Sequence, residues 1–196
     1  APIKLATNAD EASQLAADME FPVVLKIASD KILHKSDIGG VKVGIESEEE
    51  AKATFDEIIA NAKKAHPDIV PDGVEVQKMM ETGQEVIVGM IKDKQFGPMI
   101  AFGMDGIYVN LIEDVSFKLA NGISSQEIDE QINDTKVSEL LKGYRGEAPC
   151  DIDAVKEAIK RVARLTLDFP EISELDINPI FVYENGSSAL DIKIKL

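Results

Sequence analysis

The chain has 196 residues, of which 44% are hydrophobic and 29% are charged, a balance typical of folded globular domains. Its 36 acidic and 21 basic residues give a formal net charge of -15 at pH 7, which argues against binding to nucleic acids or anionic membranes. A single cysteine, Cys150, allows no internal disulfide, and no stretch is apolar enough for a signal peptide or membrane span, so we expect a cytoplasmic protein.

The first predicted elements alternate between helix and strand. Residues 10–19 have helical apolar spacing, and FPVVLKI at 21–27 is typical of a buried strand. A glycine-containing loop leads to a second strand at 41–45, and the capping-box pattern at 47–50 begins a helix that ends near His66. Because the chain opens on a helix signal without an initiating methionine, we expect the natural subunit to be longer at its N-terminus.

Strand patterns dominate from residue 73 to about 119, where turn residues separate them, and they predict an antiparallel sheet. Three helical stretches follow, opened by Ser124, by Lys136, and by Asp151 or Asp153. Two last strands, 173–183 and 189–196, are joined across the turn sequence ENGSS.

These runs of strands and helices favour an α+β architecture over a doubly wound parallel sheet. The loop PDIVPDG is the best boundary between two lobes. We therefore expect a small lobe at 1–70 and a larger lobe at 71–196, which would hold the hinge and an antiparallel sheet.

Lys26 interrupts an apolar strand, so its ammonium group must reach solvent or meet an anion. Solvation is the more common outcome for such a lysine alone. The loop that follows gathers further cations and small residues in an acidic chain, which would stabilise a polyphosphate; they are Lys31, His34, Lys35, Gly39, Gly40 and Lys42. The diglycine would equally suit a tight turn, and the Walker A spacing is absent.

His34 could accept a phosphoryl group, because neutral imidazole is nucleophilic near pH 7. Ordinary solvation is the alternative for a lone surface histidine. His66, at the end of a helix, is expected to complement the helix C-terminus.

Near the C-terminus, Asp176 and Asn178 share one face of a strand, and Asp191 lies on the strand that returns antiparallel to it. A carboxylate and an amide oxygen suit a magnesium ion that also binds phosphates. Simple solvation of these acidic residues is the alternative. Gln77 and Glu85 lie on strands that could border an adenine and a ribose, whereas Met79 and Met80 read as core residues.

Seven segments together carry a family resemblance: FPVVLKI, HKSDIGGVKVG, EVIVGM, QFGPMIAFG, DVSFKLA, LLKGYRG and ELDINPIFVY. Through them the chain resembles the ATP-grasp β subunit of ADP-forming (NDP-forming) acyl-CoA synthetases such as archaeal acetyl-CoA synthetase. It is more distantly similar to the β subunit of succinyl-CoA synthetase.

The resemblance implies an ATP-grasp fold with an incomplete N-terminal part, and reversible formation of ATP and a free acid from acyl-CoA, ADP and phosphate with Mg2+. It also implies a hetero-oligomer with an α subunit that carries the CoA-binding and phosphohistidine domains. The resemblance assigns roles as follows: Lys26, Lys35, Ser36, Gly39 and Gly40 to phosphate; Gln77 and Met80 to adenine; Glu85 to ribose; Asn178 and Asp191 to magnesium; His34 to phosphoryl transfer, with Asp176 orienting it. Arg145 is a weaker candidate for phosphate or partner contact.

The chain departs from the family pattern at Asp105, Asn110 and Lys118, and LANG replaces LAPL. These departures bear on partner docking and on the preferred acyl group. Two other functions stay open: a succinyl-CoA synthetase subunit, which would have a glycine-rich loop where His34 stands, and a non-catalytic ATP-grasp domain that regulates a partner.

Overall fold

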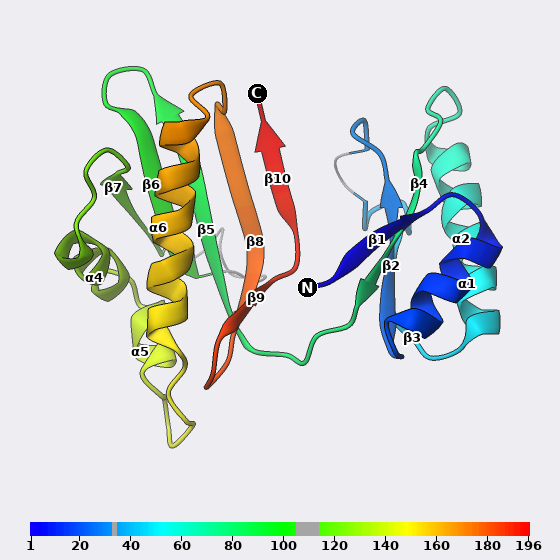
Figure 1. Cartoon of the computed structure of the whole chain (residues 1–196), viewed down its shortest axis with the longest axis horizontal. Helices are drawn as coiled ribbons and strands as arrows, with labels where there is room; N and C mark the ends of the chain where they lie inside the picture. Colours follow the sequence, from blue (N-terminus) through cyan, green and yellow to red (C-terminus); the bar gives the residue numbers. More distant parts are fainter. Residues whose placement is uncertain (33–34, 105–113) are drawn as a thin grey trace. The chain divides into compact units, whose positions relative to one another are not determined.

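The computed structural model describes residues 1–32, 35–104 and 114–196, which form two compact units, Ala1–Glu81 and Thr82–Leu196 (Figure 1). Both units combine helices with antiparallel sheets, as the sequence predicted. The units divide later in the chain than the boundary expected between residues 70 and 71. The reason is that Gly73–Lys78 pairs with two strands of the first unit and completes its sheet.

The first unit is a four-stranded sheet, in the order β1-β4-β2-β3, with two helices on one face (Figure 1). Its elements are β1 (Ile3–Ala6), α1 (Ala9–Asp18), β2 (Val23–Ala28), β3 (Val41–Ile45), α2 (Glu48–Ala65) and β4 (Gly73–Lys78). All three strand pairs are antiparallel. Strand β1 was not anticipated, because its four residues are mostly exposed and carry a weak strand signal.

Local capping explains where both helices of this unit begin. The Asn8 side chain accepts a hydrogen bond from the Glu11 amide, and Ser47 accepts one from the Glu50 amide. The Glu50 carboxylate reaches past Ser47 and accepts from the Glu46 amide at 2.9 Å. The Ser47–Glu50 pattern therefore predicted the helix start correctly. In a standard capping box the Glu50 carboxylate would accept from the Ser47 amide, whereas here it accepts from the amide one residue earlier.

The core of the first unit lies between the sheet and its helices. Alternate residues of β2 and β4 point toward α1 and α2 and are almost fully buried; they are Val23, Leu25, Ile27, Val74 and Val76. Period-two alternation therefore leaves Val24, Lys26, Glu75 and Gln77 on the opposite face of the sheet.

The second unit is a six-stranded sheet with its helices on one face (Figure 1). Its elements are β5 (Gln84–Asp93), β6 (Gly97–Met104), β7 (Val115–Leu119), α4 (Ser125–Asn133), α5 (Val137–Leu141), α6 (Ile152–Asp168), β8 (Glu174–Val182), β9 (Ser187–Ala189) and β10 (Ile192–Lys195). The strand order is β10-β8-β5-β6-β7, and β9 pairs with β8. Within the region of strand patterns predicted at 73–119, the segment GIYVNLI at 106–112 lies outside the described residues.

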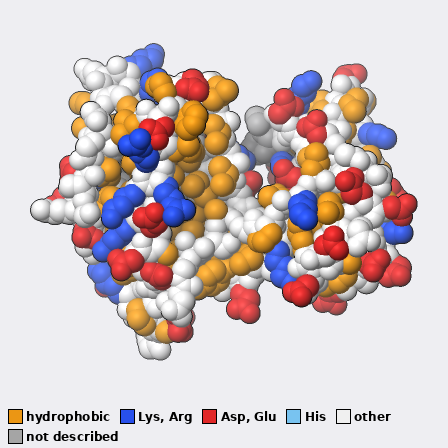
Figure 2. Space-filling view, viewed as in Figure 1, with side chains coloured by type: hydrophobic (Ala, Val, Ile, Leu, Met, Phe, Trp, Pro, Cys, Tyr) orange, Lys and Arg blue, Asp and Glu red, His pale blue; other side chains and the backbone are white. Residues whose placement is uncertain are grey.

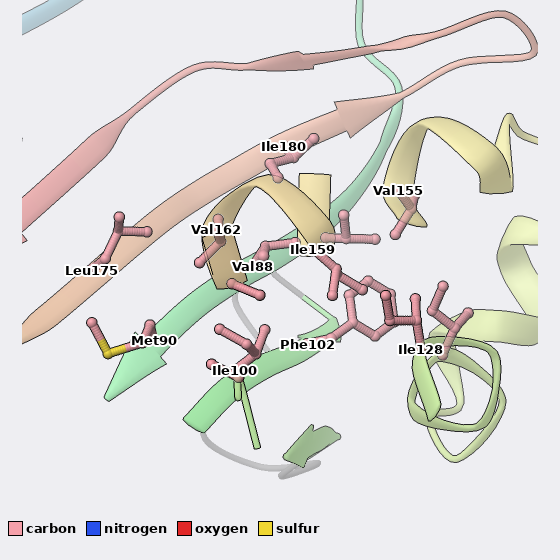
Figure 3. Close-up of a cluster of buried hydrophobic side chains, with 14 of the residues drawn as sticks. Val88, Met90, Ile100, Phe102, Ile128, Val155, Ile159, Val162, Leu175 and Ile180 are labelled. Atoms are coloured by element: carbon pink, nitrogen blue, oxygen red, sulfur yellow. The ribbon is translucent and has the colours of Figure 1, made fainter. Parts of the chain in front are cut away.

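A second, separate core fills the space between this sheet and α4, α5 and α6. Figure 3 shows Val88, Met90, Ile100 and Phe102 of the sheet packed against Ile159 of α6 and its neighbours. Each unit thus has a hydrophobic core of its own.

On the surface of the second unit, α6 carries paired charges, whereas the edge strand β10 exposes apolar side chains. Figure 2 shows basic and acidic side chains interspersed over α6, where Arg161 pairs with Glu157 and Arg164 with Asp168. Strand β10 is the last strand in the sheet order, and its Ile192 and Ile194 are 55% and 53% exposed. Among the described residues, we find no helix with both the length and the apolar character that a membrane crossing requires.

Candidate functional site

In the first unit, the candidate residues gather on the face of the sheet that the helices leave open. Lys26 on β2 lies directly opposite Glu75 on the neighbouring strand β4. Side chains opposite one another on antiparallel strands share a face, with Cβ atoms about 4.5–5.5 Å apart. The Lys26 and Glu75 side chains therefore leave the sheet side by side on its open face.

Lys35, in the loop between β2 and β3, joins this pair. Its Nζ lies 3.4 Å from Oε2 of Glu75, and the two side chains are 21% and 31% exposed. We refer to Lys26, Lys35 and Glu75 as the lysine–carboxylate cluster. The sequence analysis did not identify Glu75, because its position beside Lys26 depends on the register between β2 and β4.

The cations expected to gather in this loop divide between the two faces. Lys42 lies opposite Leu25 on the helix side of the sheet, and its Nζ is 2.7 Å from Oε1 of Glu57 on α2. Lys42 therefore does not join the lysine–carboxylate cluster. His34, the proposed phosphoryl acceptor, lies outside the described residues.

The amides of Gly39 and Gly40, which were expected to line the phosphate site, have backbone partners in this structure. Their amides donate hydrogen bonds to the carbonyl oxygens of Ser36 and Lys35, at 3.0 and 2.8 Å, and close the loop on itself. The Gly40 carbonyl in turn accepts from the Ile27 amide at 2.7 Å. These amide donors are thus used within the protein, so the two glycines shape the loop rather than offering open donors.

Gln77 shares the open face with Lys26, since it lies opposite Val24 on β2. Its side chain is only 4% exposed. Met80 follows three residues later, at the end of the first unit, and is half-buried. Of the two candidates for the adenine contact, Gln77 therefore lies near the end of β4 and Met80 just beyond it.

In the second unit, one candidate magnesium ligand, Asn178, lies on β8 and the other, Asp191, immediately precedes β10. The Asn178 amide donates to the Asp191 carbonyl at 3.1 Å, which continues the β8–β10 register in which Ile177 faces Ile192. Asn178 and Asp191 are therefore cross-strand neighbours with side chains on one face. The Asp191 carboxylate also accepts from the Ile192 amide at 3.1 Å.

Asp176 lies close to this pair, two residues before Asn178 on the same strand. It lies between Lys193 of β10 and Gly89 of β5. A Cβ built on Gly89 would be 3.9 Å from Oδ1 of Asp176, so the carboxylate lies over the glycine. Glu85 is on the same open face, because Val86 and Val88 point into the core.

The donor set suits a magnesium ion that keeps most of its coordination sites for other oxygens. In residues 1–32, 35–104 and 114–196, no three acidic, histidine or cysteine side chains are placed to hold a metal together. One carboxylate and one amide oxygen fit Mg2+, which is commonly bound by few protein ligands plus phosphates and water. The Asn178–Asp191 pair therefore fits a magnesium–nucleotide complex better than an all-protein metal site.

Three further residues from the sequence analysis have structural surroundings of their own. Lys118, a departure from the family pattern, pairs with Glu130 of α4 at 3.2 Å. Arg145 has a positive φ of 53 degrees, and its guanidinium lies 5.2 Å from the Tyr144 ring centroid. Burial raises the pKa of the Cys150 thiol, so the sulfur is a poor nucleophile near neutral pH. Asp105 and Asn110 lie outside the described residues.

Comparison with known proteins establishes the class of this fold. A family model described as an ATP-grasp domain matches residues 1–196. In a solved structure of Ca. Korarchaeum cryptofilum dinucleotide forming acetyl-coenzyme A synthetase 1, in complex with coenzyme A, Ca-AMPCP and HgCl+, a matching chain is 42% identical with a TM-score of 0.95. The match covers 100% of this chain and 85% of that one. The two α+β units are therefore an ATP-grasp fold, as the sequence predicted.

Two curated relatives are equally similar in sequence. Subunit β of the ADP-forming acetate–CoA ligase I of Pyrococcus furiosus is 45% identical over 193 residues, which are 98% of this chain and 83% of that subunit. The ADP-forming acetate–CoA ligase I of Archaeoglobus fulgidus is 45% identical over 196 residues, all of this chain but only 28% of that ligase. The chain belongs to the ATP-grasp domain family, in the group of the β subunits of ADP-forming acetate–CoA ligases.

Proposed function

We propose that this chain is the nucleotide-handling part of an ADP-forming acyl-CoA synthetase, which converts acyl-CoA, ADP and phosphate into a free acid, CoA and ATP. The observation that carries this proposal is the 45% identity across 83% of a subunit β with that named activity. The candidate residues fit, since cations lie on the open face of one unit and oxygen ligands lie on the open face of the other.

Within this proposal, the ammonium groups of Lys26 and Lys35 bind nucleotide phosphate, as Coulomb attraction on a half-buried surface favours. Ser36 and the turn at Gly39 and Gly40 shape the loop beside them. Gln77 and Met80 border the adenine, and Glu85 accepts from a ribose hydroxyl.

The Asn178 amide oxygen and the Asp191 carboxylate would hold Mg2+. When bound, that ion would neutralise phosphate charge during phosphoryl transfer. His34 would take the phosphoryl group and pass it to ADP, and the Asp176 carboxylate would assist that transfer. These assignments give each unit a defined part in the same reaction.

The reaction also needs groups that this chain does not supply under the proposal. A partner α subunit would bind the CoA ester, form the acyl phosphate and deliver the phosphoryl group through a histidine of its own, in a hetero-oligomer. We propose a cytoplasmic location, which agrees with the free thiol of Cys150.

Nucleotide binding tests the first part of the proposal. Calorimetric titration with ADP and Mg2+ should give saturable binding, and Asp191→Asn should weaken it about tenfold or more, because a charged magnesium ligand is lost. Asp153→Asn is the matched control, since it removes the same charge from a highly exposed side chain in the same unit. Equal affinities for both variants would contradict the magnesium assignment.

Turnover tests the second part. Purified chain and its α partner should form ATP from acetyl-CoA, ADP and phosphate. With labelled phosphate, the acid-labile label on this chain should disappear in His34→Ala. Absence of ATP formation would refute the proposed activity, and label that survives in His34→Ala would refute the proposed acceptor.

A further inference from the structure

The lysine–carboxylate cluster places a negative charge where the proposed function needs a positive surface. Glu75 lies directly opposite Lys26 across the strands, and its carboxylate is 3.4 Å from the Lys35 ammonium. Its other strand neighbour is Leu5 of β1, which carries no charge. A polyphosphate bound by the two lysines would therefore meet a carboxylate within the same cluster.

Burial makes this carboxylate more influential than an ordinary surface acid. The side chains of Lys35 and Glu75 are 21% and 31% exposed, so solvent screens their interaction less than it screens a fully exposed pair. At this site the carboxylate attracts both ammonium groups and repels an incoming phosphate. Both effects oppose nucleotide binding.

We propose that Glu75 is a built-in competitor of the nucleotide phosphates. Its carboxylate engages Lys35 and balances the charge of Lys26 while the site is empty, and the phosphates take its place as partner of these ammonium groups when nucleotide binds. Glu75 acts through the two lysines, and it keeps nucleotide affinity low enough for release after each turnover. This inference rests on the proposed nucleotide-binding function.

The test compares ADP affinity in Glu75→Gln and the native chain by calorimetric titration. The amide keeps the shape of the side chain and removes its charge, so the Kd should fall about three- to tenfold, the size expected when one unit charge is removed near a phosphate. Glu75→Asp keeps the charge and should leave the Kd within about twofold of the native value.

The Lys42–Glu57 pair offers a matched control in the same unit. Glu57→Gln also raises the net charge by one and also frees a lysine, but on the helix side of the sheet. Its Kd for ADP should equal that of the native chain. A fall of the same size in both variants would mean that overall charge alone is responsible, and would overturn the proposal.

Lysine reactivity gives a second readout that needs no nucleotide. Glu75→Gln should raise the rate at which an amine-reactive reagent labels Lys35, measured by mass spectrometry, and should leave the rate at Lys42 unchanged. ADP should suppress labelling of Lys35 in both forms. If the labelling rate at Lys35 were the same in Glu75→Gln and the native chain, the Glu75 carboxylate would not limit the reactivity of the Lys35 ammonium, and the proposal would be wrong.

The outcomes separate this inference from the function on which it rests. If the native chain binds ADP and Glu75→Gln binds it equally or more weakly, the competitor role is wrong and the nucleotide site stands. If neither form binds ADP, the proposed function fails, and the competitor role fails with it.

Discussion

At the scale of single residues, Gly40 has a packing role, although its place in a diglycine near several cations also suggests a phosphate-binding loop. A Cβ at Gly40 would lie 2.8 Å from Cγ2 of Ile27 and 2.8 Å from the Lys35 carbonyl oxygen. Real Cβ atoms do not approach that closely. The absence of a side chain therefore lets the loop that carries Lys35 press against β2.

Gly40→Ala should lower the free energy of unfolding by about 1–3 kcal/mol, because the added methyl forces strand and loop apart. Gly44→Ala is the comparison, since a Cβ there meets nothing within 4 Å. Its positive φ of 74 degrees should still cost about 1–2 kcal/mol. Denaturant unfolding followed by circular dichroism measures both, and titration of Gly40→Ala should also show weaker ADP binding. Unaltered ADP affinity in a destabilised Gly40→Ala would separate this loop from the nucleotide site.

At the scale of elements, Gln131 ties a helix to the sheet of the second unit. Its fully buried side chain on α4 donates from Nε2 to the carbonyl oxygens of Ile100 on β6 and Ser116 on β7, at 2.8 and 3.0 Å. A buried carbonyl that loses its donor retains the cost of its desolvation. Gln131 thus fixes how α4 lies across these two strands.

Gln131→Leu should destabilise the second unit by about 1–3 kcal/mol, because it leaves both carbonyls without this donor at similar side-chain volume. Asn133→Ala, on the exposed side of the same helix, should change stability by about 0.5 kcal/mol or less. Thermal unfolding of the two variants checks the difference. Equal melting temperatures would show that the Gln131 bridge contributes little.

Asp151 makes α6 sensitive to pH. Hydrogen bonds from the Ala154 and Gly186 amides, at 3.0 and 2.8 Å, hold the pKa of its carboxyl below the ordinary value. Because the folded-state pKa is the lower one, the ionised form favours folding above the unfolded-state pKa of about 3.9. This contribution falls as the pH drops from there through the folded-state pKa.

Asp151→Asn keeps a cap acceptor and removes the charge, so it isolates this effect. The native chain should melt at a higher temperature than the variant near pH 7. The gap should narrow as the pH falls below about 4, because the carboxyl of the unfolded native chain is protonated from there and that of the folded chain follows at lower pH. A gap that is constant from pH 7 to pH 3 would contradict the prediction.

Local signals made the helices predictable from sequence, whereas strand partners were harder to infer. Ser47, Ser124 and Asp151 each accept a backbone hydrogen bond at the helix starts expected for them. The strand at 73–78 was expected in the wrong sheet, because the choice of partner depends on residues far along the chain. Strands β8 and β10 are close in sequence, so the neighbourhood of Asn178 and Asp191 could be predicted. The position of Glu75 in the candidate site could not be predicted, since its partner Lys35 is 40 residues away in the sequence.

At the scale of the whole molecule, each unit buries its own hydrophobic cluster. Among the residues that the structure describes, the core of the second unit consists of residues after Thr82, and that of the first consists of residues before Glu81. A unit with a complete core has the main requirement for independent folding. The ATP-grasp fold is thus assembled here from two separately packed halves.

Residues 82–196 expressed alone should therefore fold. The fragment should show a helical circular dichroism spectrum and a cooperative thermal transition, and Gln131→Leu should lower its melting temperature as it does in the whole chain. A fragment without a cooperative transition would show that the second core depends on residues 1–81.

Strand β10 has a consequence for solubility. It ends the sheet order, and its exposed isoleucines alternate with the exposed lysines Lys193 and Lys195. A bare edge rich in isoleucine is a template onto which a foreign strand can add, and from which aggregates grow. The two lysines act as gatekeepers, because a second copy of this edge would bring their like charges together and be repelled.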